Sequence, residues 1–274
     1  MSVMCRAPAC DLYLFAHPDD DIFVHAMLRR GVRQQRRVVV IYLTHGGAGG
    51  RFSVPRRRNE AMHAMRSAGV ADRDVHFVGV DRGIADGELF GHMEHCFQEV
   101  CVIASRVDRI KSVVSHAWEG GHPDHDAAHL IARAVATLHG CLDQSRAFPA
   151  YRSADIAGLP FAVYAPHKGN GPRYDYRLGM REGMEALLAM RHYRSQWKTF
   201  LGLGPGIALQ LLFIRSIPLQ RLGDSNAPTR PSAGRLLSET RFGAKFDQCE
   251  KRAISFMKNH GIVVPSSVHE RVDQ

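Results

Sequence analysis

The stretch Asp11-Leu-Tyr-Leu-Phe-Ala16 runs directly into His17-Pro-Asp-Asp-Asp21. Its apolar and aromatic side chains predict a buried β-strand. This strand therefore ends in an imidazole and three consecutive carboxylates. So much negative charge at the end of a buried strand is unfavourable unless a cation neutralises it. We therefore expect a metal ion at this end of the strand.

A second motif of the same kind is His116-Ala-Trp-Glu-Gly-Gly-His-Pro-Asp-His-Asp126, after the apolar run Ser112–Ser115. Imidazole and carboxylate ligands without a thiolate suit zinc, or iron(II), in a catalytic site that keeps one coordination position open. A single His-Pro-Asp tripeptide is commonly a turn with a capping aspartate. Two such tripeptides, each after a predicted strand, favour a shared metal site.

Short apolar runs alternate with amphipathic stretches along the first half of the chain. This alternation predicts an α/β fold, a Rossmann-like and mostly parallel sheet with helices on both faces. Functional side chains of such sheets gather beyond the carboxyl ends of the strands, so the two motifs are expected to meet at one edge. We predict strands at 11–16, 37–43, 75–80 and 112–115, and helices at 21–36, 59–68, 93–107 and 126–139.

The sequence resembles the N-acetylglucosaminyl-phosphatidylinositol de-N-acetylase family, also called the PIG-L or LmbE-like deacetylases. The resemblance depends on the two motifs Ala16–Asp20 and His122–His125. Supporting matches are Leu43–Gly47, Arg58–Glu60 and Tyr193–Gln196. It covers about residues 11 to 200, so we expect a deacetylase domain over 1–200 and a C-terminal elaboration over 201–274, packed on the same domain.

The resemblance implies an LmbE-like deacetylase fold and a role for each motif residue. His17, Asp20 and His125 would bind zinc, with iron(II) or another divalent metal as the alternatives. Asp19 would accept a proton from the attacking water. His122 would stabilise the oxyanion or protonate the leaving amine, with Asp124 orienting its ring.

Seven further positions have less specific interpretations. Arg58 and Glu60 would contact substrate hydroxyls by the same resemblance, although the pair also fits capping or surface roles. Asp21 stands where the family usually has glutamate, and we expect little effect on the chemistry. His45 could reach the site from the second strand. After the third predicted strand, Asp81, Asp86 and Gly87 are interpreted as turn formers.

These features predict an enzyme that hydrolyses the N-acetyl group of an N-acetylglucosamine-type conjugate to acetate and a free amine. The alternatives are a metal-dependent amide hydrolase for a non-sugar substrate, or a non-catalytic protein that binds an anionic partner. The net charge of +9 makes an anionic or lipid-linked amino sugar slightly more attractive. No motif typical of nucleic-acid binding accompanies the charge. A homo-oligomer is compatible with the sequence.

The apolar stretch Leu201–Leu222 is interrupted by Gln210 and Arg215, so it falls short of the ~20 residues that span a bilayer. We predict a buried helix without a transmembrane span; an interfacial segment or a substrate lid is the alternative. Residues 224–234 are predicted to form a surface loop. The absence of close CxxC pairs and of a signal-peptide pattern before Asp11 favours a cytoplasmic location.

Overall fold

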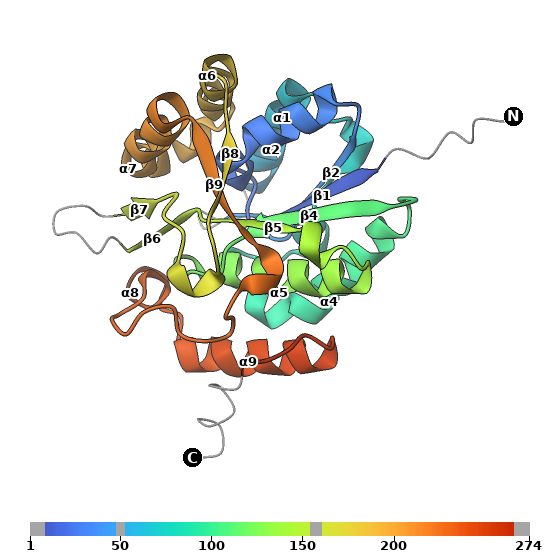
Figure 1. Cartoon of the computed structure of the whole chain (residues 1–274), viewed down its shortest axis with the longest axis vertical. Coiled ribbons are helices and arrows are strands. Elements are labelled where there is room, and N and C mark those ends of the chain that lie inside the picture. Colours follow the sequence, from blue (N-terminus) through green and yellow to red (C-terminus); the bar gives the residue numbers. More distant parts are fainter. Residues whose placement is uncertain (1–8, 48–52, 154–160, 266–274) are drawn as a thin grey trace, which may run out of the picture.

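A computed structural model describes residues 9–47, 53–153 and 161–265 of the chain. Residues 1–8 lie outside the described residues. They belong to the segment in which the sequence shows no signal-peptide pattern. The described part forms a central sheet between two layers of helices (Figure 1). This confirms the predicted α/β class with helices on both faces.

The central sheet has seven strands in the order β3-β2-β1-β4-β5-β9-β8. The first five strands are parallel, whereas β9 is antiparallel to both β5 and β8. A separate hairpin pairs β6 with β7. The strands are β1 (Cys10–Phe15), β2 (Arg37–Tyr42), β3 (Val75–His76), β4 (Ile110–His116), β5 (Arg146–Phe148), β6 (Tyr151–Ser153), β7 (Phe161–Val163), β8 (Tyr174–Arg177) and β9 (Ser216–Arg221).

Strand β1 lies between β2 and β4, and the chain order reverses there. Every residue of β1 is buried, as expected for a strand that helices cover on both faces. Open α/β sheets bind their ligands at such a switch point, beyond the carboxyl ends of the strands. The loops that follow β1 and β4 carry the two sequence motifs.

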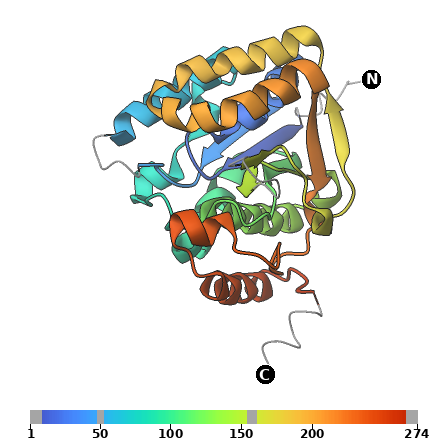
Figure 2. The ribbon, with the colours of Figure 1, turned by 90° about the vertical axis from the view of Figure 1, so that its left-hand side faces the viewer.

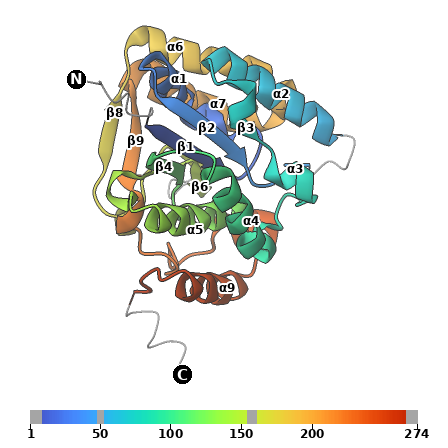
Figure 3. The ribbon, with the colours of Figure 1, turned by 90° about the vertical axis from the view of Figure 1, so that its right-hand side faces the viewer.

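Helices α1, α2, α6 and α7 cover one face of the sheet, and α4 and α5 cover the other (Figures 1 and 3). Helix α9 forms a further layer on α4 and α5. The helices are α1 (His25–Arg33), α2 (Ser53–Ala68), α3 (Val78–Arg82), α4 (Leu89–Ala104), α5 (Pro123–Leu138), α6 (Met180–Ala189), α7 (Trp197–Ala208), α8 (Leu237–Phe242) and α9 (Phe246–Asn259). Short 3₁₀ turns are Asp20–Phe23, Asp72–Asp74, Leu142–Gln144, Lys168–Asn170, Met190–His192, Arg194–Gln196 and Leu222–Asp224.

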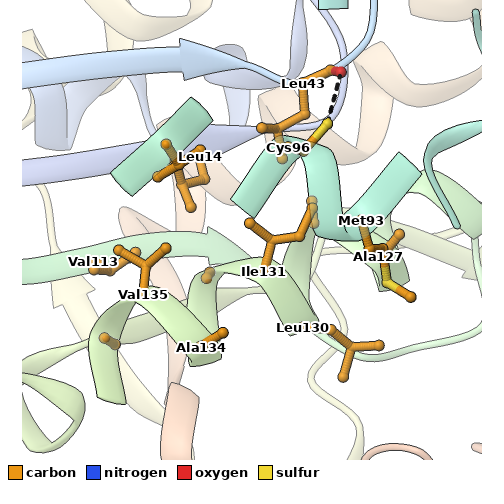
Figure 4. Packing of buried hydrophobic residues seen from close by; sticks show 14 of the residues in the cluster. Leu14, Leu43, Met93, Cys96, Val113, Ala127, Leu130, Ile131, Ala134 and Val135 are labelled. Carbon is orange, nitrogen blue, oxygen red and sulfur yellow. Dashed lines mark hydrogen bonds between the residues drawn. The ribbon is translucent and has the colours of Figure 1, made fainter. Parts of the chain in front are cut away.

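The larger core lies between the sheet and helices α4 and α5 (Figure 4). Leu14 of β1 and Val113 of β4 share this core with Ile131 and Val135 of α5, and all four are buried. The Cys96 thiol of α4 lies 4.0 Å from the Leu43 carbonyl oxygen just after β2. This packing fixes α5, and hence its N-terminus, against the end of β1.

The predicted strand at 75–80 is wrong beyond His76, because the chain turns into α3 at Val78. Gly79 lies against the backbone of Thr44, where a Cβ atom would come within 2.2 Å of Thr44 Cα. A glycine within a strand pattern often marks such a close backbone approach. The chain therefore leaves the sheet at this point.

The helix predicted in Leu201–Leu222 extends only to Ile214, and the prediction that it is buried is wrong. Helix α7 continues into a π-helix at Leu209–Ile214, and the chain then enters β9. Among the described residues, Arg194–Ile214 is the one helix long and apolar enough to cross a membrane by length and composition. Only 22% of its most apolar 18 residues are buried, and Trp197, Leu201, Leu209, Phe213 and Ile214 are exposed.

Residues 224–234 are less exposed than the predicted surface loop. Ser225 and Ala227 are buried, and Trp118 Nε1 donates a hydrogen bond to the Thr229 carbonyl oxygen at 2.8 Å. This contact exists because the indole N–H of a buried tryptophan needs an acceptor. The segment thus covers the motif loop after β4.

Candidate metal centre and active site

The two motifs meet at the switch point of the sheet. His17 follows β1, Asp20 opens the 3₁₀ turn after it, and His122 is the N-cap residue of α5. Beside them lies a cavity of about 440 Å³ whose wall includes His17, Asp20 and His122. Residues that lie more than a hundred positions apart in the sequence therefore share one site.

His17, Asp20 and His125 can hold a metal ion together. One ligand atom from each lies within 4.8 Å of the others, and all three residues are buried. Asp20 Oδ2 lies 3.2 Å from His17 Nδ1, and Asp20 Oδ1 lies 3.3 Å from His125 Nε2. Both ring nitrogens of His125 are buried without a hydrogen-bond partner. A buried imidazole with free nitrogens beside a carboxylate fits a divalent cation.

The charges around this triad also favour a cation. Burial alone would lower the pKa of His17, but the carboxylates of Asp86 and Asp20 outweigh it and raise this pKa well above its usual value. Burial likewise opposes ionisation of Asp20, yet the neighbouring imidazoles hold the pKa of Asp20 well below its usual range. The site therefore favours a positive charge at His17 and a negative charge at Asp20.

Asp19 lies on the cavity wall and pairs with Arg57 of α2. Arg57 Nη2 donates to Asp19 Oδ1 at 2.6 Å, and Arg57 also donates to the carbonyl oxygen of Gly46. Burial raises the pKa of Asp19 to about 7, although the Arg57 guanidinium counteracts part of the shift. A carboxyl group with a pKa near neutrality is suited to general base catalysis.

The structure places Arg57, rather than Arg58, in the cavity wall. Arg58 is exposed and lies over the ring of Phe77, with its guanidinium carbon 5.3 Å from the ring centroid. Glu60 is buried outside the cavity wall, and its carboxylate accepts hydrogen bonds from Ser195 N at 3.0 Å and Ser195 Oγ at 2.5 Å. Glu60 therefore ties α2 to the segment that precedes α7.

His122 has a fixed orientation at the start of α5. Its Nδ1 accepts a hydrogen bond from the backbone N–H of Asp124 at 3.1 Å. A neutral ring with Nδ1 as acceptor carries its proton on Nε2. This Nε2 lies 3.0 Å from Asp86 Oδ1. The backbone of Asp124 orients His122, whereas the nearest carboxylate oxygen of Asp124 lies 4.0 Å from Nδ1.

The Asp124 carboxylate instead joins His17 to the segment between α3 and α4. Its Oδ2 lies 3.1 Å from His17 Nε2 and accepts the Gly87 N–H at 2.6 Å, while Oδ1 accepts the Leu89 N–H at 3.0 Å. These bonds place Asp86 on the cavity wall. Asp86, interpreted from the sequence as a turn former, is therefore part of the site.

Asp86 also belongs to a second group that could hold a metal, made of His17, Asp86, His122 and Asp124. In this group the Asp124 oxygens and His122 Nδ1 already accept backbone N–H groups. His125 in the first group has no such engagement. In the first group Asp20 Oδ2 also accepts the His17 N–H, at 2.7 Å, but both ring nitrogens of His125 have no hydrogen-bond partner among the described residues. The first group therefore has the freer imidazole and is the better metal site.

A family model described as PIG-L, GlcNAc-PI de-N-acetylase, matches residues 12–136 of the chain. The matched residues include β1, β4, the start of α5 and every member of the metal triad. Over these residues the chain matches the PIG-L family. The match identifies an N-deacetylase, a hydrolase, and the structure gives it histidine and aspartate side chains that could hold a metal ion.

Solved deacetylase structures show the same fold as this chain. A zinc-inhibited form of teicoplanin deacetylase Orf2 is 14% identical with a TM-score of 0.59, over 77% of this chain and 97% of that one. The A40926 pseudoaglycone deacetylase Dbv21 is 18% identical with a TM-score of 0.56 over the same shares. N,N'-diacetylchitobiose deacetylase from Pyrococcus horikoshii is 17% identical with a TM-score of 0.53, over 78% and 84%.

Behind His17, Asp20 and His125, the site is supported by buried polar groups. The ring of His116 stacks on His125 at 3.9 Å between centroids, and its Nε2 accepts the Ala16 N–H at 3.2 Å. Asp21 accepts hydrogen bonds from the hydroxyls of Tyr42 and Tyr193. These contacts hold the backbone on both sides of His17 in place.

His45, which the sequence left as a candidate, does not line the cavity. Its Nδ1 accepts the Gly47 N–H at 3.0 Å and thereby closes the turn after β2. The neighbouring Gly46 has a positive φ of 62° and lies against Arg57, where a Cβ atom would clash with the guanidinium. The glycine is thus required for the close approach that holds Arg57.

Proposed function

We propose that the protein catalyses zinc-dependent hydrolysis of the N-acetyl group of an N-acetylglucosamine-type conjugate. The products are acetate and a free amine. The observation that carries the proposal is the meeting of the His17, Asp20 and His125 triad with Asp19 and His122 beside one cavity. A carboxyl group and an imidazole beside a metal site are the groups that amide hydrolysis needs.

A divalent cation held by the triad would supply Lewis acidity, which acidifies water and polarises an amide carbonyl. Asp19, held by Arg57, accepts a proton from the attacking water. The water oxygen bonds to the carbonyl carbon at the same time. His122 donates a hydrogen bond from its neutral Nε2–H to the developing oxyanion, and Asp19 passes the proton that it has accepted to the leaving nitrogen. The C–N bond breaks, the protonated nitrogen departs as the amine, and the acyl group departs as acetate.

The cavity wall supports a sugar conjugate with an anionic part. Tyr151, Phe161 and Phe242 offer flat apolar surfaces, while Lys198 and Arg241 add positive charge. Aromatic rings with a few polar groups are typical of small-molecule pockets. The Pyrococcus horikoshii relative is a deacetylase of an acetylated amino sugar by its description. An anionic N-acetylglucosamine conjugate is the substrate class that fits these features best.

The test is acetate release from a panel of N-acetylglucosamine conjugates by protein loaded with zinc after chelation. Asp19→Asn removes the proton acceptor and keeps the side-chain shape, so kcat should fall by about 10² to 10⁴-fold. Asp81→Asn changes an exposed aspartate outside the cavity wall and is the matched control. It should retain wild-type activity.

Folded, zinc-loaded protein that releases no acetate from the whole panel would contradict an amino-sugar substrate. Release of another acid from a non-sugar amide, still abolished by Asp19→Asn, would then identify the broader amide hydrolase. Full activity after chelation, with metal content verified by elemental analysis, would contradict the dependence on a metal.

A further inference from the structure

Helices α6 and α7 and the π-helix carry an unusual set of exposed apolar side chains. Phe213 is 74% exposed, Leu201 69% and Trp197 56%. The two helical segments run side by side (Figure 2) and contact each other. We call the exposed set the α6–α7 face; it consists of Met180, Met184, Leu188, Trp197, Leu201, Leu209, Phe213 and Ile214.

The α6–α7 face is continuous because of helix geometry. Its members Trp197, Leu201, Leu209 and Phe213 belong to one series spaced by four residues, and the position between them is the exposed Pro205. In an α-helix such a series drifts by about 40° per step. The wider turns of the π-helix at Leu209–Ile214 reduce this drift. The series therefore remains on one side of the segment.

The opposite side of the same segment packs on the protein. Leu203, Ile207 and Leu211 are buried in the core. Gly183 of α6 approaches the Leu211 carbonyl oxygen so closely that a Cβ atom would lie 2.2 Å from it. The segment is thus firmly attached along its inner side, and the outward apolar residues are additional to those that folding uses.

Basic residues outnumber acidic residues in the segments that carry the α6–α7 face. Residues 180–215 contain five arginines and lysines and two glutamates. Both glutamates pair with arginines of α1, Glu182 with Arg30 and Glu185 with Arg29. Within the described ranges, no carboxylate forms an ion pair with the four basic residues Arg191, Arg194, Lys198 and Arg215. Lys198 lies over the Trp197 ring, with its Nζ 5.7 Å from the ring centroid. An apolar face beside cations that no carboxylate neutralises is complementary to an anionic membrane surface.

The attachment of the segment excludes a membrane crossing in this fold. At its N-terminal end Ser195 is bonded to Glu60 of α2, and at its C-terminal end the chain enters β9 between β5 and β8. A span would need these ends on opposite sides of a bilayer, whereas both belong to one domain. The helix can lie along a membrane but cannot traverse it while the sheet is intact.

We propose that the α6–α7 face docks the protein onto anionic phospholipid membranes as an interfacial, non-spanning contact. Its apolar side chains enter the boundary between headgroups and acyl chains, and Arg191, Arg194, Lys198 and Arg215 contact lipid phosphates. The cavity wall includes Lys198 and Leu203 of the same helix. Docking therefore holds the catalytic cavity beside the lipid surface, independently of which substrate it takes.

The chain contains its own reporter for this contact. Of its two tryptophans, Trp118 is buried and Trp197 lies within the α6–α7 face. Vesicles of phosphatidylcholine and phosphatidylglycerol in equal parts should shift the tryptophan emission to the blue. Brominated lipids should quench it, and Trp197→Phe should abolish both responses. An unchanged emission spectrum in the presence of these vesicles would contradict docking through this face.

Vesicle sedimentation of the full chain then measures affinity. Leu201→Ser with Phe213→Ser should weaken binding more than tenfold, since two large apolar groups no longer enter the lipid. The matched control is Val102→Ser with Leu138→Ser, which removes exposed apolar groups from α4 and α5 on the other layer. This control should bind like the wild type. Equal binding by both double variants would overturn the proposal.

The charge contribution has its own test. Arg191→Gln with Arg215→Gln should weaken binding to the mixed vesicles by about fivefold per charge. Neither residue lines the cavity, so activity on a soluble substrate should remain. Light scattering that shows a dimer, dissociated by Leu201→Ser with Phe213→Ser and without vesicle binding, would identify a second copy of the chain as the partner and overturn the membrane proposal.

Discussion

The end of β1 and the α6–α7 face show opposite departures from ordinary burial. At β1 and α5, histidines and aspartates are buried, and at α6 and α7 large apolar side chains lie in solvent. Buried polar groups and exposed apolar patches are the informative exceptions to hydrophobic burial. In the first region the exception brings together groups that could hold a metal ion, and in the second it is the surface that we propose for membrane docking.

The largest expected effect in the comparison of the two regions is at Arg57. Its buried guanidinium holds Asp19 beside the candidate metal site. Arg57→Ala should lower kcat by about 10²-fold, because Asp19 loses the guanidinium that holds it at 2.6 Å. Arg57→Lys should recover part of this loss. The adjacent Arg58→Ala removes an exposed arginine and is the control. Steady-state kinetics and thermal unfolding of all three variants measure the effect. Equal losses at both positions would contradict the assignment of Arg57.

A second test separates the two regions by stability. Gly183→Ala should destabilise the protein by about 1 to 3 kcal/mol, because the added methyl group meets the Leu211 carbonyl oxygen. Gly204→Ala in α7 has only the Met190 side chain within 4 Å and should be neutral or slightly stabilising. Urea unfolding measures both. Zinc affinity by calorimetry should stay unchanged in each, and a loss in Gly183→Ala would show that the regions are coupled.

The smallest effect concerns a buried carboxyl group near the site. Burial raises the pKa of Glu119 from its usual 4.5 to about 8, although the Ala150 N–H donates to its carboxylate. A carboxyl group with a raised folded-state pKa loses stabilisation as pH rises between these two values. The free energy of unfolding of Glu119→Gln should therefore rise relative to that of the wild type by about 1 kcal/mol or more between pH 5 and 8. Urea unfolding across this range that gives parallel curves would contradict a neutral Glu119.

The catalytic half of the fold was predictable because its sequence signals are local and strong. Strand β1 with its motif, β2, α2 and the start of α5 follow from apolar runs and from His-Pro-Asp tripeptides. Arg57 was also within reach, because the helical spacing of Ala61, Ala64 and Ala68 extends back to position 57 on the same buried face. The residues of the metal triad come together as expected from a parallel sheet.

Other parts depend on contacts that no local pattern encodes. Asp86 enters the site only because distant Asp124 binds the neighbouring N–H groups, whereas the sequence shows an ordinary Asp-Gly turn. The antiparallel strands β8 and β9 pair across a long helical insertion. The exposure of α7 could not be read from hydropathy, because an apolar helix has the same composition in a core and on a surface.

The Asp124 carboxylate links three segments that lie far apart in the chain, since it bonds to His17, 107 residues away, and to Gly87, 37 residues away. Such contacts form only when β1, α5 and the segment before α4 have docked. His17 and His125 therefore come together only in the folded chain. An ion held by them and Asp20 would stabilise the folded state by mass action.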